Sequence, residues 1–436
     1  MESSALINKR ILVVGLGVTG LSVVRYLSRE GLGFEVADEK ADNNVFSDLP
    51  GQPIMHRTFT AELFNRFDIL VLSPGIPRAH PAIVAALDAG VDVIGDIELF
   101  ASAVDVPVIA VTGSNGKSTV VAWLAFSLNE CGVKAEACGN IGKPALDCLS
   151  TDASVLVLEL SSYQLESTRT LRPLCASVLN VSDDHLDRYD DIEHYASVKR
   201  RVYKHAQHCV ANLDDKRTWP RDETKDACTY ISVETSGAHT TPNDEKPLDR
   251  QVLDGLNLSV PGDHNIGNAL AVLALVSPLK VSKECLIAAL PRFRGLAHRS
   301  EFVGERDGVR WYNDSKGTNV DACEKAIKAM PGPVILIAGG LGKGADFTPL
   351  QTTVSQYVKL LVLIGQDKVH IASVLDCHVK TVMAQSLTEA VAVAGSAATQ
   401  GDVVLLSPAC ASFDMFRNFE DRGEQYIAAV QEVLAA

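Results

Sequence analysis

The sequence predicts an α/β protein built from mostly parallel sheets, and three observations support this fold class. The chain has 436 residues, which is more than one hydrophobic core usually serves, so three domains are expected. Short runs rich in aliphatic and β-branched residues alternate with stretches of helical pattern. These runs are apolar throughout, which is typical of strands whose two faces are both covered by helices.

The order of these runs suggests where the domains divide. One boundary is expected near Gly95, where a first set of strands ends, and another near His298, after a helical region at 265–290. The expected domains are residues 1–95, 96–297 and 298–436. Strands are expected at 10–14, 34–37, 69–72, 106–112, 155–160, 176–181, 334–338, 360–364 and 403–406.

Composition excludes several classes of function. The chain has 54 acidic and 40 basic residues and a formal net charge of -14, which opposes binding to nucleic acid or anionic lipid. No stretch approaches the roughly 20 apolar residues of a membrane span, and the first residues lack the apolar core of a signal peptide. A cytoplasmic protein without membrane insertion is therefore expected. The ten cysteines are dispersed and are expected to be reduced and mostly buried.

A first glycine-rich loop follows the first expected strand. The segment GLGVTG at 15–20 begins a helix, and Asp38 ends the next strand. Bare glycine backbone and a helix N-terminus can receive a diphosphate, while an acidic residue takes a ribose hydroxyl. The pattern fits NAD, a nucleotide-sugar or merely a tight turn, and it does not separate them. The turn Ser73–Ile76 follows another strand at the same sheet edge, where open sheets bind ligands.

A second glycine-rich loop is a far more specific signal. The segment TGSNGKST at 112–119 joins a buried strand to a helix. Its backbone N–H groups can cradle phosphates, Lys117 can reach the terminal phosphates, and the hydroxyl of Ser118 or Thr119 can reach Mg²⁺. Val111 stands where the strict motif has glycine, so this is a variant phosphate-binding loop. ATP binding is expected.

Two further residues are candidates for metal binding. Glu159 ends the strand that begins at residue 155, and His185 follows the strand 176–181. Carboxyl ends of parallel strands share one sheet edge, so both side chains are expected near the phosphate loop. Hard oxygen ligands suit the Mg²⁺ that phosphoryl transfer requires.

Ten sequence blocks in order along nearly the whole chain resemble those of the amino-acid-adding ligases of peptidoglycan assembly. The phosphate loop and the block DDHLDRY also resemble the wider superfamily, which includes the folylpolyglutamate synthetases. The first glycine loop and the last block resemble the members that add D-glutamate. The blocks are GLGVTG at Gly15, GDIELF at Gly95, TGSNGKST at Thr112, GNIGKPAL at Gly139, LELSSYQLE at Leu158, DDHLDRY at Asp183, HNIGNALA at His264, NDSKGTN at Asn313, GGLGKGADF at Gly339 and SPACASFDMFRNFEDRG at Ser407.

The resemblance implies an architecture and a reaction. It implies a Rossmann-like N-terminal domain for a uridine diphosphate substrate, a central P-loop ATPase-like domain, and a Rossmann-like C-terminal domain for the amino acid. The carboxylate of UDP-N-acetylmuramoyl-L-alanine would attack ATP to give an acyl phosphate. The amine of D-glutamate would then attack that carbonyl through a tetrahedral intermediate. A monomer that uses ATP and two Mg²⁺ sites is expected.

The resemblance also implies the roles of individual residues. Ser118 and Glu159 would hold one Mg²⁺, while His185 and a carbamylated Lys199 would serve the second. Residues implied for ATP are Gly113, Ser114, Asn115, Gly116, Lys117, Ser118, Thr119, Asn268, Arg299 and Asp314. Residues implied for the UDP substrate are Gly15, Gly17, Val18, Thr19, Asp38, Gly75 and Asn140, the last near the reacting carboxylate. Residues implied for D-glutamate are Lys316, Thr318, Lys343, Ser412, Phe413 and Phe419.

Other functions remain open at this stage. A sibling ligase for another amino acid, or a folate polyglutamylating enzyme, would share the phosphate loop, and the last block separates them from the D-glutamate reaction. An NAD-dependent oxidoreductase would use residues 15–20 but leave Lys117, Glu159 and Lys199 without a role. An inactive nucleotide-binding module would be expected to lack Lys117, Glu159 or His185, and the sequence has all three.

Overall fold

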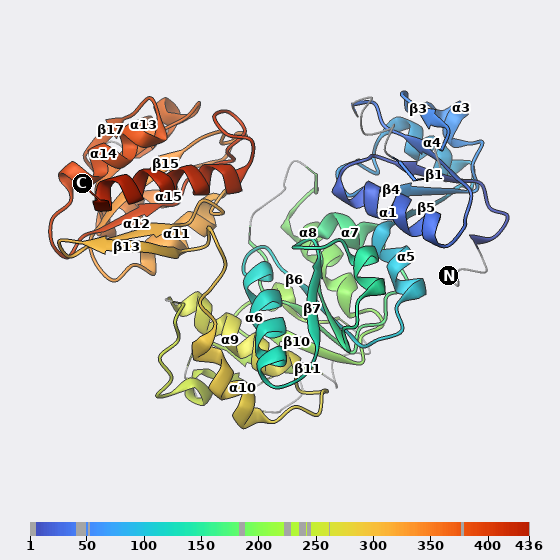
Figure 1. The fold of residues 1–436 in the computed structure, drawn as a ribbon, viewed down its shortest axis with the longest axis horizontal. Helices are drawn as coiled ribbons and strands as arrows, with labels where there is room; N and C mark the ends of the chain where they lie inside the picture. The colour runs from blue at the N-terminus through green and yellow to red at the C-terminus, as the bar shows by residue number, and fades with distance from the viewer. Residues whose placement is uncertain are drawn as a thin grey trace. The chain divides into compact units, whose positions relative to one another are not determined.

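The computed structural model describes residues 6–40, 49–50, 53–182, 188–221, 228–234, 241, 246–260, 262–375 and 379–435. These residues form three sheets flanked by helices (Figure 1). The chain divides into two compact units, Met1–Asp254 with Asn268–Ala289, and Gly255–Gly267 with Leu290–Ala436. Within the described ranges, no helix is both long enough and apolar enough to span a membrane.

The first sheet is parallel, with strand order β3-β2-β1-β4-β5. Successive residues of β1 point to opposite faces, so Ile11 and Val13 pack in one apolar cluster and Leu12 and Val14 in another. Both faces are therefore covered. The elements are β1 Ile11–Val14, α1 Val18–Arg29, β2 Phe34–Ala37, β3 Met55–His56, α3 Ala61–Phe64, β4 Ile69–Leu72, α4 Pro81–Asp88, β5 Asp92–Gly95 and α5 Asp96–Ala103.

The second sheet belongs to the same unit and is also parallel, with order β12-β11-β10-β9-β6-β8-β7. Its strand β6, which lies between β9 and β8, leads into the phosphate loop. The elements are β6 Val108–Thr112, α6 Lys117–Glu130, β7 Ala135–Gly139, β8 Val155–Glu159, α7 Ser162–Glu166, β9 Cys175–Val178, α8 Ile192–Arg200, β10 His208–Asn212, β11 Cys228–Ser232, β12 Leu248–Asp249, α9 Asp263–Leu275 and α10 Lys283–Ala289, with short 3-10 helices at Ala145–Ser150, Arg201–Tyr203, Lys216–Thr218 and Arg250–Leu253.

The third sheet forms the second unit, with order β13-β14-β18-β15-β16-β17. Only the β13–β14 pair is antiparallel among its pairings. The elements are a 3-10 helix Leu290–Arg292, β13 Glu301–Arg306, β14 Val309–Asn313, α11 Val320–Lys328, β15 Val334–Gly339, α12 Leu350–Tyr357, β16 Val358–Ile364, α13 Lys368–Leu375, β17 Thr381–Met383, α14 Leu387–Ala397, β18 Val403–Leu406 and α15 Phe419–Ala435.

The predicted α/β class is confirmed, and each expected strand has a counterpart in the structure. The helical region 265–290 is two helices, α9 and α10. The strands that the sequence did not predict are short or carry polar residues. β7, for example, reads AEACG and is only partly buried, because it lies at the edge of its sheet.

A buried carboxyl group lies where α5 meets α7 within the first unit. Asp96 begins α5 and is 2% exposed. Its Oδ2 accepts a hydrogen bond from Nε2 of Gln164 at 3.2 Å, while among the described residues Oδ1 has no partner. Burial raises the pKa of Asp96 to about 6 from 3.8. The protonated form therefore stabilises the fold below about pH 4, and this contribution is lost as the pH rises through about 6.

Asp96→Asn is expected to weaken the pH dependence of stability. The wild type carries an ionised buried carboxylate above pH 6, at a cost on the order of 3 kcal/mol, and the variant does not. The melting temperature of the variant, minus that of the wild type, should therefore increase between pH 5 and pH 7.5. Calorimetry over this range tests it, with the exposed Asp152→Asn as a control. A difference that stays constant with pH would contradict the assignment.

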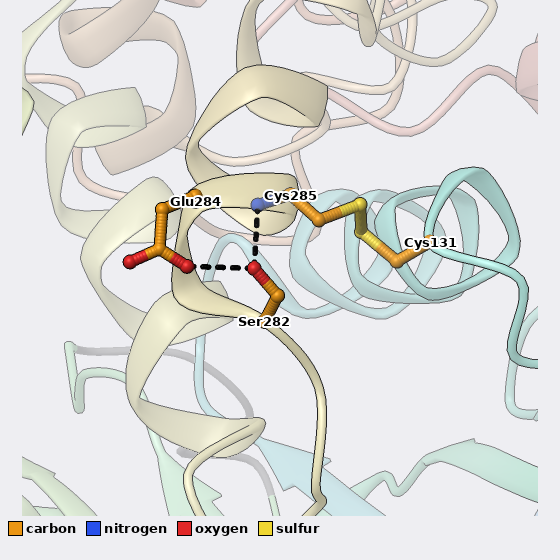
Figure 2. Close-up of a disulfide and its surroundings, with 4 residues drawn as sticks. All are labelled: Cys131, Ser282, Glu284 and Cys285. Atoms are coloured by element: carbon orange, nitrogen blue, oxygen red, sulfur yellow. Dashed lines mark hydrogen bonds between the residues drawn. A yellow bond between two sulfur atoms is a disulfide. The ribbon is translucent and has the colours of Figure 1, made fainter.

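Cys131 and Cys285 form a disulfide, which corrects the prediction that the cysteines are reduced. Their Cα atoms lie 5.9 Å apart, although 154 residues separate them in sequence. Cys131 directly follows α6 as its C-cap, and Cys285 lies in the first turn of α10 (Figure 2). The Cys285 N–H donates to Oγ of Ser282, which in turn donates to Glu284 (Figure 2). The seven free cysteines in the described ranges are all buried, as predicted.

A reducing agent is expected to lower the thermal stability of the first unit. A disulfide across so long a loop restricts the unfolded chain, and such bonds typically contribute about 2–4 kcal/mol. The melting temperature should fall by several degrees when dithiothreitol is added. A Cys131→Ser/Cys285→Ser double variant supplies the control, because its melting temperature should not respond to the reductant. An equal response of both proteins would show that the effect comes from elsewhere.

Candidate active site

The phosphate loop joins β6 to α6. Residues that follow β9 hold it in place by hydrogen bonds. Gly113 and Gly116 have φ values of +154° and +84°, which strongly favour glycine. The Asn115 N–H donates to Oδ1 of Asn180 at 2.8 Å, and Nδ2 of Asn180 donates to the carbonyl of Asn115 at 3.0 Å. The Ser114 N–H donates to the Asn180 carbonyl at 2.9 Å. Asn180 thus fixes the backbone conformation of the loop through these hydrogen bonds.

The sequence reasoning missed Asn180 and also Ser182, whose N–H donates to Oγ of Ser114 at 3.0 Å. The available signal was their position just after β9, which neighbours β6 in the sheet. Asn268 does lie at the loop, as expected. A Cβ atom on Gly116 would come within 2.6 Å of its Oδ1, so only glycine allows this approach.

Two lysine side chains converge on the same loop carbonyl. The Nζ of Lys117 donates to the carbonyls of Gly113 at 2.8 Å and Ser114 at 2.9 Å. The Nζ of Lys199, from α8, donates to the Gly113 carbonyl at 2.8 Å. Lys199 is only 1% exposed, which is rare for lysine. Its Nζ also lies 4.3 Å from the ring centroid of Tyr195.

Glu159 and Asn140 form the neighbouring part of the site. Glu159 ends β8, pairs in register with Val111 of β6, and is 1% exposed. The Nδ2 of Asn140 donates to Oε1 of Glu159 at 2.9 Å. The other oxygen, Oε2, is buried and has no hydrogen-bond partner among the described residues. A buried carboxylate oxygen without a donor is a suitable ligand for a hard cation such as Mg²⁺.

Ser118 and Thr119 lie in the first turn of α6 and are nearly buried. His185 lies outside the described residues. Within the part of the chain that the structure describes, no group of three or more His, Cys, Asp or Glu side chains is arranged to hold a metal ion. Among the described residues, Glu159 Oε2 and the hydroxyl groups of Ser118 and Thr119 are the oxygens that could hold a cation here.

The first glycine loop is held by the neighbouring strand ends of the first sheet. The N–H of Leu16 donates to Oδ2 of Asp38 at 2.6 Å, and Oγ of Ser73 donates to the carbonyl of Gly15 at 2.7 Å. Gly75 follows in the same turn as Ser73. A Cβ atom at Gly20 would lie 1.8 Å from the Gly15 carbonyl oxygen, so the close turn requires glycine there.

The structure thus brings together the loop residues Gly15 and Gly17, Asp38 and the turn that contains Gly75. Val18 begins α1 and is 71% exposed, so its backbone, with that of Thr19, presents the helix N-terminus to solvent. The Asp38 carboxylate also accepts from the N–H of Lys40 at 2.8 Å. Its two oxygens therefore order the loop itself.

In the second unit, the residues expected for D-glutamate lie on three loops that follow adjacent parallel strands. These strands are β14, β18 and β15, which are neighbours in the sheet. The Ala409 N–H donates to the Gly317 carbonyl at 2.8 Å, and the Leu341 N–H to the Ala411 carbonyl at 2.9 Å. These bonds tie the three loops together. Lys316 and Thr318 lie on the first, Ser412 and Phe413 on the second, and Lys343 on the third.

Aromatic rings accompany both lysines of these loops. The Nζ of Lys316 lies 3.7 Å from the ring centroid of Phe419, and that of Lys343 lies 5.8 Å from the ring of Phe413. Phe413 is 65% exposed whereas Ser412 is buried. The loops therefore offer two cations, a hydroxyl and exposed aromatic surface within one sheet edge.

Asp314 is a buried acid of the same unit. Its Oδ2 accepts from Oγ of Ser407 at 2.7 Å and its Oδ1 from the N–H of Ser300 at 3.1 Å. Burial raises the pKa of Asp314 to about 6, against the opposing charges of Arg299 and Arg422. Asp314 and Arg299 lie in the second unit and Asn268 in the first.

Comparison with known proteins identifies the family. Three family models match: Mur ligase MurD-like, N-terminal domain, at residues 9–95; Mur ligase middle domain at 111–276; and Mur ligase, glutamate ligase domain, at 298–410. A UDP-N-acetylmuramoylalanine–D-glutamate ligase of Marinobacter nauticus is 46% identical over 97% of this chain and 98% of its own. The chain belongs to the Mur ligase family. A ligase of the same name from Nitrosococcus oceani is 42% identical, over 97% of this chain and 96% of its own.

Solved structures of Mur ligase relatives share the fold. A pseudomurein peptide ligase type C from Methanothermus fervidus matches with a TM-score of 0.61 at 16% identity, covering 98% of this chain and 100% of its own. The MurC ligase of Thermotoga maritima gives 0.60 at 17% identity with the same coverage. The MurF ligase of that organism, solved with ADP, gives 0.59 at 15% identity and covers 99% of both chains.

Proposed function

We propose that this Mur ligase joins D-glutamate to UDP-N-acetylmuramoyl-L-alanine at the expense of ATP, releasing ADP and phosphate. Relatives with 39–46% identity over nearly the whole chain carry the name of this reaction. The observation that carries the proposal is the phosphate loop with Lys117, following a strand whose Val111 pairs with the buried Glu159, whose Oε2 has no donor in the described residues. The reaction makes a peptidoglycan precursor from a UDP-linked substrate. The enzyme is proposed to act in the cytoplasm and as a monomer.

Each expected domain has a proposed role. Residues 1–95 would bind the uridine diphosphate end through the loop at Gly15, the helix start at Thr19 and the turn at Gly75. Residues 96–297 would bind ATP, and residues 298–436 the amino acid. The loop at residues 15–20 and its helix N-terminus suit a diphosphate because backbone N–H groups and the helix dipole favour negative charge.

Activation of a carboxylate requires that ATP be held and its terminal phosphate polarised. Lys117 already points at the loop interior, where its Nζ meets two carbonyls, and a bound phosphate would offer it a stronger, charged acceptor. Asn268, at the edge of the loop, is proposed to contact the adenine, with Arg299 and Asp314 on the phosphate and ribose side. The acyl phosphate then gives the substrate carbonyl a good leaving group.

Magnesium is proposed to bind Glu159 Oε2 and the hydroxyl of Ser118, with His185 serving a second ion. Bound there, the metal would neutralise charge on the transferring phosphate. The hydrogen bond from Asn140 to Oε1 leaves Oε2 as the oxygen directed to the metal. Asn140 could equally donate to the muramoyl carboxylate once that substrate binds.

Lys199 is proposed to be carbamylated. The ammonium would first lose one proton, and the neutral amine would then attack CO₂, forming an N–C bond and losing a second proton, so that a buried cation becomes an anion. The support is its 1% exposure and its place beside the Gly113 carbonyl, since a carbamate would replace a buried ammonium with oxygens able to orient the second metal.

The amino acid is proposed to bind on the three tied loops of the second unit. A dicarboxylate needs cations and oriented donors, which Lys316, Lys343, Thr318 and the buried hydroxyl of Ser412 would supply. Phe413 and Phe419 would pack against the aliphatic part of the substrate. The free amine would attack the acyl phosphate, and the tetrahedral intermediate would expel phosphate and lose a proton to give the amide.

Phosphate release tests the proposal directly. The enzyme is given ATP, Mg²⁺ and UDP-N-acetylmuramoyl-L-alanine with D-glutamate, L-glutamate, L-lysine or diaminopimelate in parallel, and a reaction without the UDP substrate serves as blank. Release that depends on both the UDP substrate and D-glutamate is expected. Release with another amino acid would keep the chemistry but overturn the proposed acceptor. No release with any would overturn the proposed function.

A further inference from the structure

The first turn of α15 contains a buried arginine that is not among the expected site residues. Arg422 is 1% exposed. It lies on the inner face of α15 with Tyr426, Ala429 and Val430, which are all buried and recur at the spacing of one helix face. An arginine on an otherwise apolar face is the signal that sequence reasoning could have used.

The guanidinium group of Arg422 bonds to two of the three loops described above. Its Nε donates to Oγ of Ser315 at 2.9 Å and its Nη2 to the Ser315 carbonyl at 2.8 Å. Its Nη1 donates to the carbonyl of Cys410 at 3.1 Å. Ser315 directly precedes Lys316, and Cys410 lies two residues before Ser412. The planar, forked geometry of arginine is what allows one side chain to bond both loops.

The third loop also approaches this group. A Cβ atom on Gly340, in the loop after β15, would lie 3.4 Å from Nη1 of Arg422 and 2.3 Å from the carbonyl of Ala411. The loop can therefore come this close only with glycine at 340. All three loops that carry the expected D-glutamate residues thus meet around one buried cation.

Other residues at the start of α15 support the same loops. The hydroxyl of Ser315 donates to the carbonyl of Phe419 at 2.8 Å, and the Phe419 ring faces Lys316. A Cβ atom on Gly423 would lie 2.2 Å from Nδ1 of His298, whose carbonyl accepts from the Lys316 N–H at 3.0 Å. The first turn of α15 therefore supports the loops that carry the expected D-glutamate residues.

The hydrogen-bond partners of Arg422 are two carbonyls and a hydroxyl, and the nearby carboxylates of Asp414 and Asp314 favour its charged form. Burial lowers the pKa of Arg422 to about 10, so the group stays protonated at neutral pH. A well-packed apolar side chain would often stabilise a fold as well or better. The forked hydrogen bonds to both loops are what an apolar side chain could not supply.

We infer that Arg422 is a positioning residue of the amino-acid site: it holds the loops after β14 and β18 in the arrangement that binds the incoming dicarboxylate. The inference rests on the proposed function, because the amino acid is assigned to these loops there. Arg422 acts through Ser315 and Cys410 and is not itself placed against the substrate.

Steady-state kinetics of Arg422→Lys and Arg422→Met test this inference. Neither variant can make the forked bonds, so the KM for D-glutamate should rise about tenfold or more, while the KM values for ATP and the UDP substrate change less than about twofold. At saturating D-glutamate, kcat should fall less than about threefold, because a positioning defect is largely overcome by mass action. Arg417→Met is the matched control: the Arg417 side chain is 81% exposed and pairs with Asp421 four residues later, so all constants should match the wild type.

Ser315→Ala guards against the case in which the Arg422 variants do not fold. It removes one acceptor of the guanidinium and should raise the KM for D-glutamate by about two- to fivefold without lowering the melting temperature appreciably. An unchanged KM for D-glutamate in folded variants, or an equal rise of all three KM values, would overturn the inference. If the wild type itself releases no phosphate with any amino acid, the proposed function fails instead, and the two failures are thereby distinguished.

Discussion

Lys117→Ala is expected to lower phosphate release at least about 100-fold, because removing one preorganised charge from a transferring phosphoryl group typically costs this much or more. The side chain donates to the loop carbonyls of Gly113 and Ser114 and is not part of a hydrophobic core cluster, so the fold should survive. Activity with saturating substrates and the melting temperature are the two measurements.

Lys134→Ala provides the control for charge removal from the same part of the chain. Lys134 is 69% exposed and pairs with Asp152, and it lies beyond the end of α6 that is opposite to the phosphate loop. It should retain wild-type turnover. Near-normal phosphate release by Lys117→Ala, with a normal melting temperature, would be incompatible with the proposed role of the loop.

Lys199→Ala is expected to be similarly inactive, and small carboxylates should restore part of its activity. Truncation leaves space where the buried side chain was, and acetate or formate can place oxygens where the carbamate oxygens would lie. The measurement is the rate of phosphate release against acetate concentration. Lys117→Ala serves as the matched control, because acetate cannot replace a cation and should not rescue it.

Two outcomes would count against carbamylation without touching the ligase assignment. One is a Lys199→Ala enzyme that acetate and formate fail to rescue at any concentration. The other is the absence of a carbamate carbonyl signal when the wild type is equilibrated with ¹³C-bicarbonate and observed by NMR. The expected result is that acetate or formate rescues Lys199→Ala, and that the carbamate signal seen in the wild type is absent from this variant.

The sequence predicted the fold best where one physical factor dominated. Strands buried on both faces, such as β1, β8 and β15, are apolar along their whole length, so their existence follows from composition alone. Edge strands such as β7 and β13 also carry polar residues, because part of their surface is exposed to solvent. Their pairing depends on distant partners that local pattern does not reveal.

The candidate site shows the same division. The phosphate loop and Glu159 were predictable because a motif and a strand end place them. The burial of Lys199 and the bond from Asn140 to Glu159 depend on how separate elements pack. Asn180 and Arg422 were missed because each acts on loops far away in sequence, through contacts that only the folded chain creates.

The bond between Cys131 and Cys285 also changes the topology of the chain. It closes a covalent ring that contains β7 to β12 and α9, while the phosphate loop lies on the tail just before the ring. A single peptide cleavage anywhere inside the ring would open it without releasing a fragment, so the polypeptide would remain one molecule. If the disulfide is reduced, the same cleavage would leave the phosphate loop and the whole first sheet on one polypeptide and the third sheet on another.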